Sequence, residues 1–293
     1  MKNKLNVFAN WAQEQMNKAA YQKKTPTYGT AEVDDIPYLN DGSPDHLLDV
    51  YAPRLSQEKL PVIVTVHGGG YVSNRKVCNR PHGQWLAAHG FKVVNVEYTL
   101  IPQATLAEEL AELTAAFSWV ESHAEEYGFD VNNMFLLGDS SGGHLALLMA
   151  ALQTNPALQK QAGLRPVASG IRAVGATCPV GSFRSKDPVS LAMRLLFQAL
   201  GQKDLAPYSV ENFLTKDMMD CMLITSPTDI GIHTVTHKIH QELDKKGVDH
   251  VYFNLKGRTH KLPHVFNVLY PEWEESVEAN QALLQFFRSR MAE

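Results

Sequence analysis

The sequence predicts an α/β protein with a mostly parallel central sheet and helices on both faces, and two observations support this class. From about residue 60 onward, short β-branched runs alternate with segments of helical period, which is the pattern of successive β–α–β units. A content of 44% hydrophobic and 20% charged residues in 293 is ordinary for a well-cored globular chain. We therefore expect residues 1–293 to form a single domain.

The individual elements follow from the period of the apolar residues. Leu106, Leu110, Leu113, Phe117 and Val120 recur every three or four residues, which predicts an amphipathic helix. The short β-branched runs predict buried strands. Strands are expected at 62–66, 93–96, 134–137, 173–177, 222–225 and 251–255, and helices near 85–86, over 106–120, 145–152 and 232–246, and from about 271 to 290.

Two stretches do not fit the alternation. Residues 1–45 precede the expected sheet, and residues 180–220 are too long for a simple connection between two strands. An insertion of that size in a compact domain usually carries function, such as a lid or a binding loop. It also holds an apolar cluster that a solvated connection would not need, namely Phe183, Leu191, Met193, Leu195, Leu196 and Phe197.

Charge and cysteine content exclude several classes of protein. The net charge of −4, without a run of one sign, gives no reason to expect nucleic acid as a partner. No apolar stretch approaches the roughly 20 residues of a membrane span, and residues 1–10 do not resemble a signal peptide. Three scattered cysteines form no disulfide framework. We expect a cytoplasmic protein. The sequence does not determine its oligomeric state, and a homo-oligomer is one of the possibilities.

The segment Gly138-Asp-Ser-Ser-Gly142 has the pattern G-x-S-x-G between an expected strand and an expected helix. A strand that turns at once into a helix places the middle residue in a strained conformation and exposes its hydroxyl. The flanking glycines avoid collisions across the turn. Ser140 is therefore the predicted nucleophile, rather than Ser141, which lacks the paired glycine spacing. The alternative is a loop that merely caps a helix.

A glycine-rich segment, His67-Gly-Gly-Gly70, begins where the strand at 62–66 ends. Three glycines let consecutive backbone N–H groups converge on a developing oxyanion. The amide of Ser141, at the start of the next helix, is a further donor, because a helix N-terminus favours an anion. His67 precedes the nucleophile and is expected to support the loop. The alternative is a flexible loop without function.

The acid and the base should follow Ser140 in that order, after later strands of the sheet. Asp229 comes directly after the strand at 222–225, whereas Asp220 precedes it and lies on the wrong side of the sheet. The alternative for Asp229 is a helix N-cap. Two histidines, His260 and His264, follow the last strand. We favour His264, because the loop is long enough to return it across the sheet, while His260 stays open.

Together these motifs resemble the hormone-sensitive-lipase-like and acetyl-esterase branch of the α/β-hydrolases, over residues 60–270. The segment Tyr98-Thr-Leu-Ile-Pro102 is similar to the Tyr-Arg-Leu-Ala-Pro segment of that family, with Thr99 in place of arginine, which suggests a divergent subgroup. The resemblance implies that Gly69 and Gly70 supply oxyanion-hole amides. It also implies that residues 1–45 and 180–220 form a helical cap, and that the substrates are short-acyl carboxylic esters hydrolysed without a cofactor.

Three other interpretations compete with that of a Ser140–His264–Asp229 esterase. A peptidase of the same fold would need a large extra domain, and a non-catalytic binding protein would have lost one of these three residues. A metal site could use His233, His237 and His240, which share one helix face. Zinc helices of that type carry a glutamate after the first histidine, where Thr234 stands here. We therefore expect neither a metal nor a cofactor, and a small-molecule ester as the partner.

Overall fold

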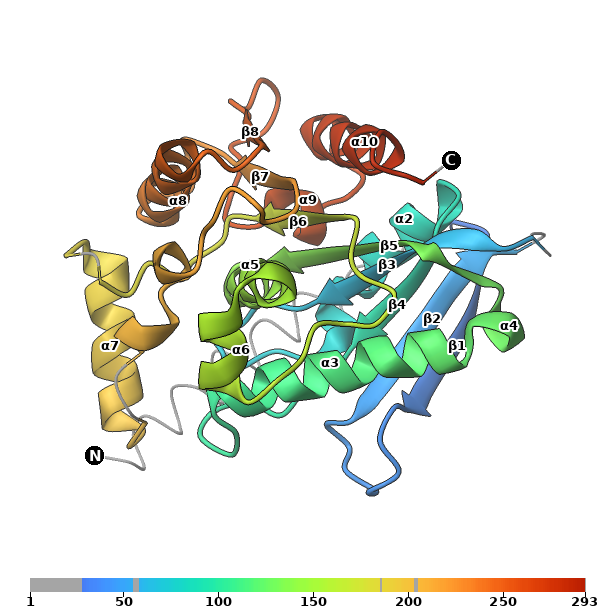
Figure 1. Cartoon of the computed structure of the whole chain (residues 1–293). Helices are drawn as coiled ribbons and strands as arrows, with labels where there is room; N and C mark the ends of the chain where they lie inside the picture. Colours follow the sequence, from blue (N-terminus) through green and yellow to red (C-terminus); the bar gives the residue numbers. More distant parts are fainter. Residues whose placement is uncertain (1–27, 55–57, 185, 203–204, 293) are drawn as a thin grey trace.

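The computed structural model describes residues 28–54, 58–184, 186–202 and 205–292. Its eight strands form one sheet in the order β1-β2-β4-β3-β5-β6-β7-β8 (Figure 1). The strands from β4 onward along this order run parallel, and β1 and β2 are antiparallel to their neighbours. The strands are β1 (Thr30–Pro37), β2 (Leu47–Pro53), β3 (Leu60–Val66), β4 (Lys92–Val96), β5 (Phe129–Asp139), β6 (Ala173–Thr177), β7 (Cys221–Thr225) and β8 (His250–Asn254).

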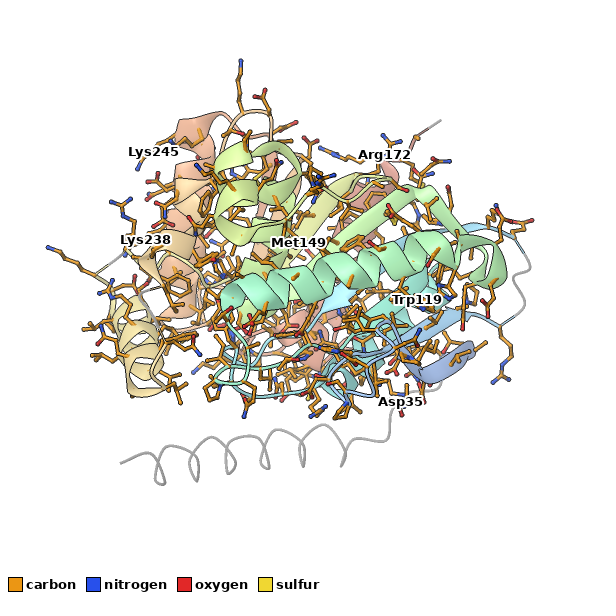
Figure 2. The ribbon with its side chains drawn as sticks, turned by 60° about the horizontal axis from the view of Figure 1, so that its bottom comes forward. Asp35, Trp119, Met149, Arg172, Lys238 and Lys245 are labelled. Atoms are coloured by element: carbon orange, nitrogen blue, oxygen red, sulfur yellow. The ribbon has the colours of Figure 1, made fainter. Side chains whose placement is uncertain are left out.

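Helices cover both faces of the sheet. On one face α3, α5 and α8 pack into a large apolar cluster, and on the other face α2, α9 and α10 pack into a second one. Figure 2 shows α3 running across the first face, with Trp119 near one end. The helices are α2 (Arg80–Ala88), α3 (Leu106–Ser122), α4 (Ala124–Tyr127), α5 (Ser141–Thr154), α6 (Pro156–Ala162), α7 (Pro188–Ala199), α8 (Ile232–Lys246), α9 (Phe266–Leu269) and α10 (Glu274–Arg288).

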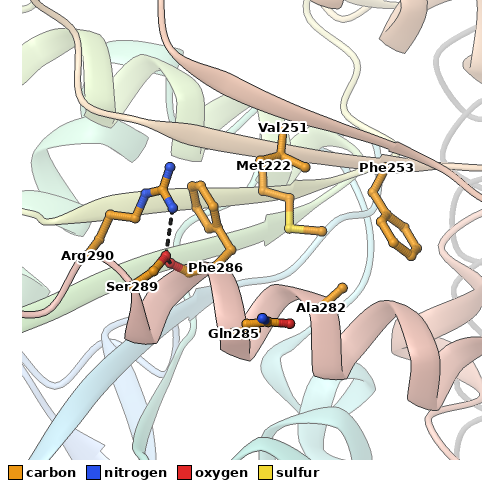
Figure 3. Close-up of a pocket in the computed structure, with 8 residues that line it drawn as sticks. All are labelled: Met222, Val251, Phe253, Ala282, Gln285, Phe286, Ser289 and Arg290. Atoms are coloured by element: carbon orange, nitrogen blue, oxygen red, sulfur yellow. Dashed lines mark hydrogen bonds between the residues drawn. The ribbon is translucent and has the colours of Figure 1, made fainter.

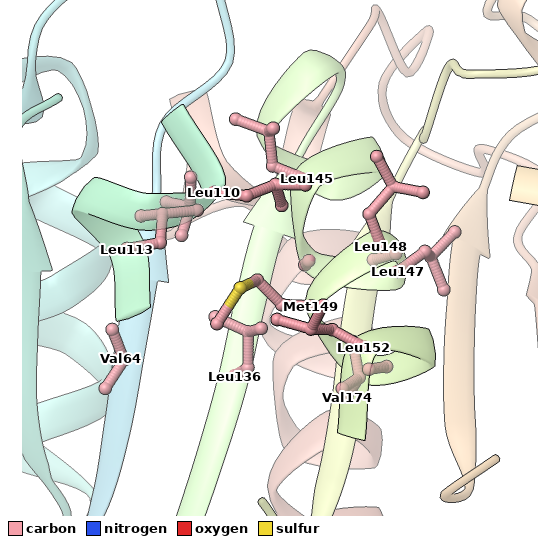
Figure 4. Packing of buried hydrophobic residues seen from close by; sticks show 14 of the residues in the cluster. Val64, Leu110, Leu113, Leu136, Leu145, Leu147, Leu148, Met149, Leu152 and Val174 are labelled. Atoms are coloured by element: carbon pink, nitrogen blue, oxygen red, sulfur yellow. The ribbon is translucent and has the colours of Figure 1, made fainter. Parts of the chain in front are cut away.

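The helix α5 is apolar on all sides, because it is buried between the sheet and its neighbouring helices. Every residue from Ser141 to Leu152 is buried. Leu145 and Met149 face Leu110 and Leu113 of α3, and Leu136 of β5 lies beneath them (Figure 4). A helix without a polar face is expected only in such a position. This packing anchors the turn that precedes α5.

The expectation that residues 1–45 belong to the cap needs correction for the part that the structure describes. Residues 30–37 were expected in the cap, but they form the edge strand β1, and β2 was not predicted at all. β1 is mostly exposed and polar, so it lacks the apolar run that marks the central strands, whereas β2 is mostly buried but has Asp49 among its apolar residues. Residues 1–27 lie outside the described residues.

The long segment between β6 and β7 contains α7, the 3₁₀ turns η2 (Ala206–Tyr208) and η3 (Val210–Asn212), and no strand among its described residues. Its apolar residues divide in two. Phe183 and Phe197 are buried in the main core, whereas Leu191 and Leu195 are 45% and 56% exposed. In the parts of the chain that the structure describes, no helix is both long and apolar enough to cross a bilayer.

Candidate active site

Three residues that are far apart in the sequence meet at the carboxyl ends of the strands. Ser140 follows β5, Asp229 follows β7, and His264 lies in the loop after β8. The Nε2 atom of His264 is 2.9 Å from the Ser140 hydroxyl, and its Nδ1 atom is 2.8 Å from Oδ2 of Asp229. Asp229 is buried, while the side chain of His264 is 37% exposed. The structure therefore brings together the three residues that the sequence selected.

The hydrogen bonds define the tautomer of His264. A carboxylate oxygen only accepts, so Nδ1 carries the hydrogen and donates it to Asp229. The Nε2 atom then has a free lone pair and accepts a hydrogen bond from the Ser140 hydroxyl. This is the arrangement in which an imidazole can remove the serine proton.

Ser140 occupies the strained turn that its sequence predicts. Its backbone has φ 53° and ψ −116°, a conformation that residues with side chains rarely adopt. Its N–H donates to the carbonyl of Thr177 on the neighbouring strand, at 2.8 Å. A Cβ on Gly138 would lie 2.1 Å from the carbonyl oxygen of Gly142, and one on Gly142 would lie 2.2 Å from that of Val66. The collisions expected across the turn are therefore confirmed.

The alternative candidates for the base and the acid, His260 and Asp220, lie away from Ser140. His260 is 2.9 Å from the carboxylate of Glu275, and its ring stacks on Trp273. Asp220 pairs with Arg290 at 3.0 Å, next to the last helix. Neither residue contacts Ser140. His260 is held by Glu275 of α10, and Asp220 is held by Arg290, just after the end of α10.

The glycine loop lies directly against the nucleophile. A Cβ on Gly68 would come within 3.0 Å of the Cβ of Ser140. Gly69 and Gly70 have φ of 128° and 63°, which favours glycine, and a Cβ on Gly69 would collide with the carbonyl oxygen of Ser73 at 1.9 Å. Ser141 begins α5, and its hydroxyl accepts the N–H of Tyr71 at 3.3 Å. The loop therefore needs its glycines for conformation and for space.

A buried charged pair, His67 and Glu97, supports this loop, and the sequence predicted this role only for His67. His67 is buried, its Nδ1 lies 2.8 Å from the carbonyl oxygen of Gly68, and its Nε2 lies 3.0 Å from Glu97. Both ring nitrogens face acceptors, so both carry hydrogens and the ring is an imidazolium. Burial alone would lower the pKa of His67, but the hydrogen bond and charge of Glu97 raise it above its ordinary value.

Glu97 was missed because nothing in its local sequence marks it as more than the residue after a strand. Its carboxylate also accepts the side chain of Arg75 at 3.1 Å and the N–H of Lys76 at 3.0 Å. Burial would raise the pKa of Glu97, but the hydrogen bond and charge of His67, followed by Arg75 and Lys76, lower it. One carboxylate thus joins the start of the glycine loop to the segment that follows it.

The other end of the loop is attached to α5 through Tyr71 and His144. The Tyr71 hydroxyl is 2.7 Å from Nδ1 of His144, whose Nε2 is 2.9 Å from the carbonyl oxygen of Tyr208. The carbonyl requires a hydrogen on Nε2, so Nδ1 accepts from Tyr71. Burial lowers the pKa of His144 to about 4, which keeps this ring neutral. His144 lies one helical turn after Ser140, so this bond joins the loop to the nucleophile's helix.

Two further buried groups flank the three central residues. The thiol of Cys178 contacts the carboxylate of Asp229, and burial together with the Asp229 charge raises the thiol pKa well above its ordinary value. The thiol is therefore protonated and can donate to that carboxylate. Asp139 accepts a hydrogen bond from Asn79 at 2.8 Å. The sequence placed Cys178 only as a small buried residue; its position at the end of β6, beside the nucleophile's strand, was the available signal.

The segment before and within α7 approaches the site from two directions. The rings of Phe183 and Phe197 lie 6.3 and 5.4 Å from the ring of Tyr71. A Cβ on Gly231, two residues after Asp229, would lie 3.1 Å from Val189. Beside it, Ile230 is 87% exposed. Apolar side chains therefore lie against Tyr71 and beside the residues that follow Asp229.

A pocket of about 270 Å³ lies elsewhere, between the last two strands and α10 (Figure 3). Met222, Val251 and Phe253 line one side, and Ala282 and Phe286 line the other. None of the predicted site residues lines this pocket. The geometry of Ser140, Asp229 and His264 therefore defines the candidate site, and this pocket does not.

A parallel sheet, a nucleophile turn after β5 and a histidine returned from the loop after β8 define the class of protein. The chain has the α/β-hydrolase fold, and it is similar to esterases of that superfamily. The BD-FAE family model matches residues 48–178. The structure is similar to that of esterase B from Lactobacillus rhamnosis, with a TM-score of 0.90, 25% identity, and coverage of 99% of this chain and 95% of that one.

Sequence comparison gives shorter matches. Esterase LipQ of Mycobacterium tuberculosis is 33% identical over 135 residues, which are 44% of this chain and 31% of that protein. A probable isoprenylcysteine alpha-carbonyl methylesterase of Arabidopsis thaliana is 31% identical over 103 residues, which are 35% of this chain and 22% of that protein. The chain thus matches about a third or less of the length of these two relatives.

Proposed function

We propose that this protein is a carboxylic ester hydrolase that acts through an acyl-enzyme. His264 takes the proton of Ser140 as the serine oxygen attacks the ester carbonyl. Asp229 holds the Nδ1 hydrogen and stabilises the imidazolium that forms. His264 then protonates the leaving alcohol, and afterwards activates a water molecule that releases the acid. The observation that carries the proposal is the pair of hydrogen bonds, at 2.9 and 2.8 Å, that His264 makes to Ser140 and Asp229.

The negative charge on the carbonyl oxygen needs donors close to Ser140. We assign this role to the backbone N–H groups of Gly69, Gly70 and Ser141. Two observations support the assignment: the loop lies within contact distance of Ser140, and Ser141 is the first residue of a 14-residue helix. A helix N-terminus and converging backbone amides both stabilise an oxyanion, and one such donor is worth about 3 kcal/mol in the transition state.

Hydrolysis of p-nitrophenyl acetate by wild type and by Ser140→Ala tests the central claim. We expect Ser140→Ala to lose at least about a thousandfold in kcat and to keep its circular dichroism spectrum, because the turn accepts a smaller side chain. Retention of more than a small fraction of the rate would place the nucleophile elsewhere, with Ser141 examined first. Activity on peptides without activity on esters would support the peptidase alternative, and the absence of both would support a binding protein.

A second pair of variants tests the base. His264→Ala should be as damaging as Ser140→Ala, and His260→Ala much milder, because His260 is bound to Glu275. The reverse ranking would move the base to His260. His260→Ala is a matched control, since both residues lie in the same loop and both are partly buried.

We further propose a preference for short acyl chains, from acetyl to butyryl, with residues 180–220 acting as the cap. Phe183 and Val189 of this segment pack near both ends of the site, and Ile230, Leu191 and Leu195 offer exposed apolar surface. The Lactobacillus rhamnosis esterase B, at 25% identity, has been crystallised after inhibition by a tributyrin phosphonate. That inhibitor is consistent with a site for butyryl groups.

A series of p-nitrophenyl esters of increasing acyl length tests the preference. Each methylene that fits contributes up to about 0.8 kcal/mol of binding, and one that does not fit loses this contribution through a clash. We expect kcat/KM to peak between acetyl and butyryl esters and to fall steeply by octanoyl. A flat or rising profile would contradict a closed cap and favour an open, lipase-like cleft.

A further inference from the structure

A second cluster of ligand atoms lies at the opposite end of the sheet from Ser140. His240 and Asp244 are one helical turn apart on α8, and His250 is the first residue of β8. One ligand atom from each of the three lies within 4.8 Å of the other two. We propose that His240, Asp244 and His250 bind one divalent transition-metal ion of the Zn²⁺ type. With a water molecule as the fourth ligand, the ion would join α8 to the edge strand.

The position of His250 separates this cluster from the proposed catalytic centre. His250 pairs with Cys221, so it stands at the amino end of β7 and β8. Asp229 and His264 follow the carboxyl ends of the same two strands. A five-residue strand spans about 13 Å at a rise of about 3.3 Å per residue. The metal would therefore take no part in ester hydrolysis, and the proposal does not depend on the proposed function.

The hydrogen bonds of His250 prepare it as a ligand. Its Nδ1 atom is 2.9 Å from the carbonyl oxygen of Val248, which only accepts, so Nδ1 carries the hydrogen. The Nε2 atom therefore offers a lone pair, which accepts the Nδ1 hydrogen of His240 at 2.8 Å, and a bound metal ion would replace that hydrogen. Metal-binding histidines usually donate their other N–H to a carbonyl or carboxylate in this way. The side chain is 6% exposed, which holds the ring in this orientation.

His240 and Asp244 complete the set with little movement. The His240 ring stacks on Tyr252, with centroids 4.2 Å apart and an angle of 4° between the planes. An Asp244 carboxylate oxygen is 3.7 Å from Nε2 of His250. Donors in a tetrahedral zinc site are about 3.3 Å apart for bonds of about 2.0 Å. The nitrogens must separate and the carboxylate approach by about 0.5 Å, and Asp244 is 60% exposed, so it is free to move.

This proposal revises the expectation that the chain binds no metal, and it uses a different set of residues from the one rejected earlier. His233 and His237 stack on each other, with their centroids 6.3 Å apart. His233 lies near the Tyr252 hydroxyl, and His237 near the side chain of Gln241. In the proposed site the carboxylate is that of Asp244 and the second histidine is His250 of β8. The earlier pattern contained only histidines of one helix face and therefore included neither residue.

Isothermal titration of the full, untagged chain with Zn²⁺ in a weakly coordinating buffer tests the site. We expect one ion per chain, and a loss of at least tenfold in affinity for both His250→Ala and Asp244→Asn. His237→Ala is the matched control, because it removes a histidine of the same helix outside the cluster, and it should bind as wild type does. Zn²⁺ should also raise the Tm of wild type and of His237→Ala, but not that of the other two variants.

Ser140's neighbourhood offers another group of donors within 4.8 Å of one another, namely Cys178, Asp229 and His264, so the titration is repeated on His264→Ala. Full binding by this variant supports the proposal, and loss of binding overturns it. Wild-type affinity in Asp244→Asn, or a loss in His237→Ala as large as in His250→Ala, also overturns it. If His250→Ala does not fold, the exposed Asp244 still provides a variant that tests the ligand set.

Discussion

Replacement of Glu109 by methionine should stabilise this protein. Glu109 lies on α3, is fully buried, and has no hydrogen-bond partner for either carboxylate oxygen among the described residues. Burial raises the pKa of Tyr71 and of Tyr98, and a charge on Glu109 would raise both further. Methionine has a similar length, keeps the helix, and removes the unsatisfied polar atoms.

The magnitude follows from the cost of an unpaired polar group. Leaving a buried donor or acceptor unsatisfied costs about 1–3 kcal/mol, and replacing it by an apolar group of similar shape removes that cost. We therefore expect Glu109→Met to raise the free energy of unfolding by about 1–3 kcal/mol near pH 5. Buried apolar surface from the methionine side chain adds to the gain.

The gain should also depend on pH, with a sign that the structure determines. Burial, with a contribution from the charge of Glu112, raises the pKa of Glu109 well above its ordinary value. The folded state therefore keeps a proton that the unfolded state releases above about pH 4.3. The stability that this proton confers is complete below the unfolded pKa and is lost as the pH rises through the folded pKa. The advantage of Glu109→Met should accordingly grow between pH 5 and pH 8.

Urea denaturation at pH 5 and pH 8 measures both quantities. Glu112→Met is the control: Glu112 lies one turn later and accepts the N–H of Thr99 at 2.7 Å, besides pairing with His46 at 3.1 Å. That variant loses real partners and should be destabilised. A loss of stability in Glu109→Met, or a gain that does not change with pH, would refute the reasoning.

Three further predictions concern the surroundings of Ser140. Cys178→Ala should lower kcat while Cys178→Ser largely preserves it, because serine still donates to Asp229; equal effects in esterase assays would remove this role. Glu97→Gln should lower the free energy of unfolding by about 1.5–3 kcal/mol and reduce kcat, since a charged hydrogen bond to His67 is lost; urea denaturation and assays that match wild type would contradict this. Gly142→Ala should yield no folded enzyme, as its Cβ would lie 2.2 Å from a backbone oxygen; a wild-type Tm would be the contrary result.

The sequence could predict the central strands, most helices and the turn at Ser140, because these depend on residues close together in the chain. Apolar runs mark buried strands, and Gly138 and Gly142 mark a turn in which any side chain would collide. The edge strand β1 was missed for the same reason, because it is mostly exposed and carries no such run. Burial alone was not sufficient either, because β2 is mostly buried and was also missed, with Asp49 among its apolar residues.

Only the tertiary structure decided which distant residues meet. His260 and His264 both follow β8, and the chain between them determines that one ring reaches Ser140 while the other is held by Glu275. Glu97 meets His67 across 30 residues because β3 and β4 pair in parallel. Such contacts depend on strand order and on the path of loops, which no local pattern contains, so the sequence could nominate the residues of the site but the fold had to select among them.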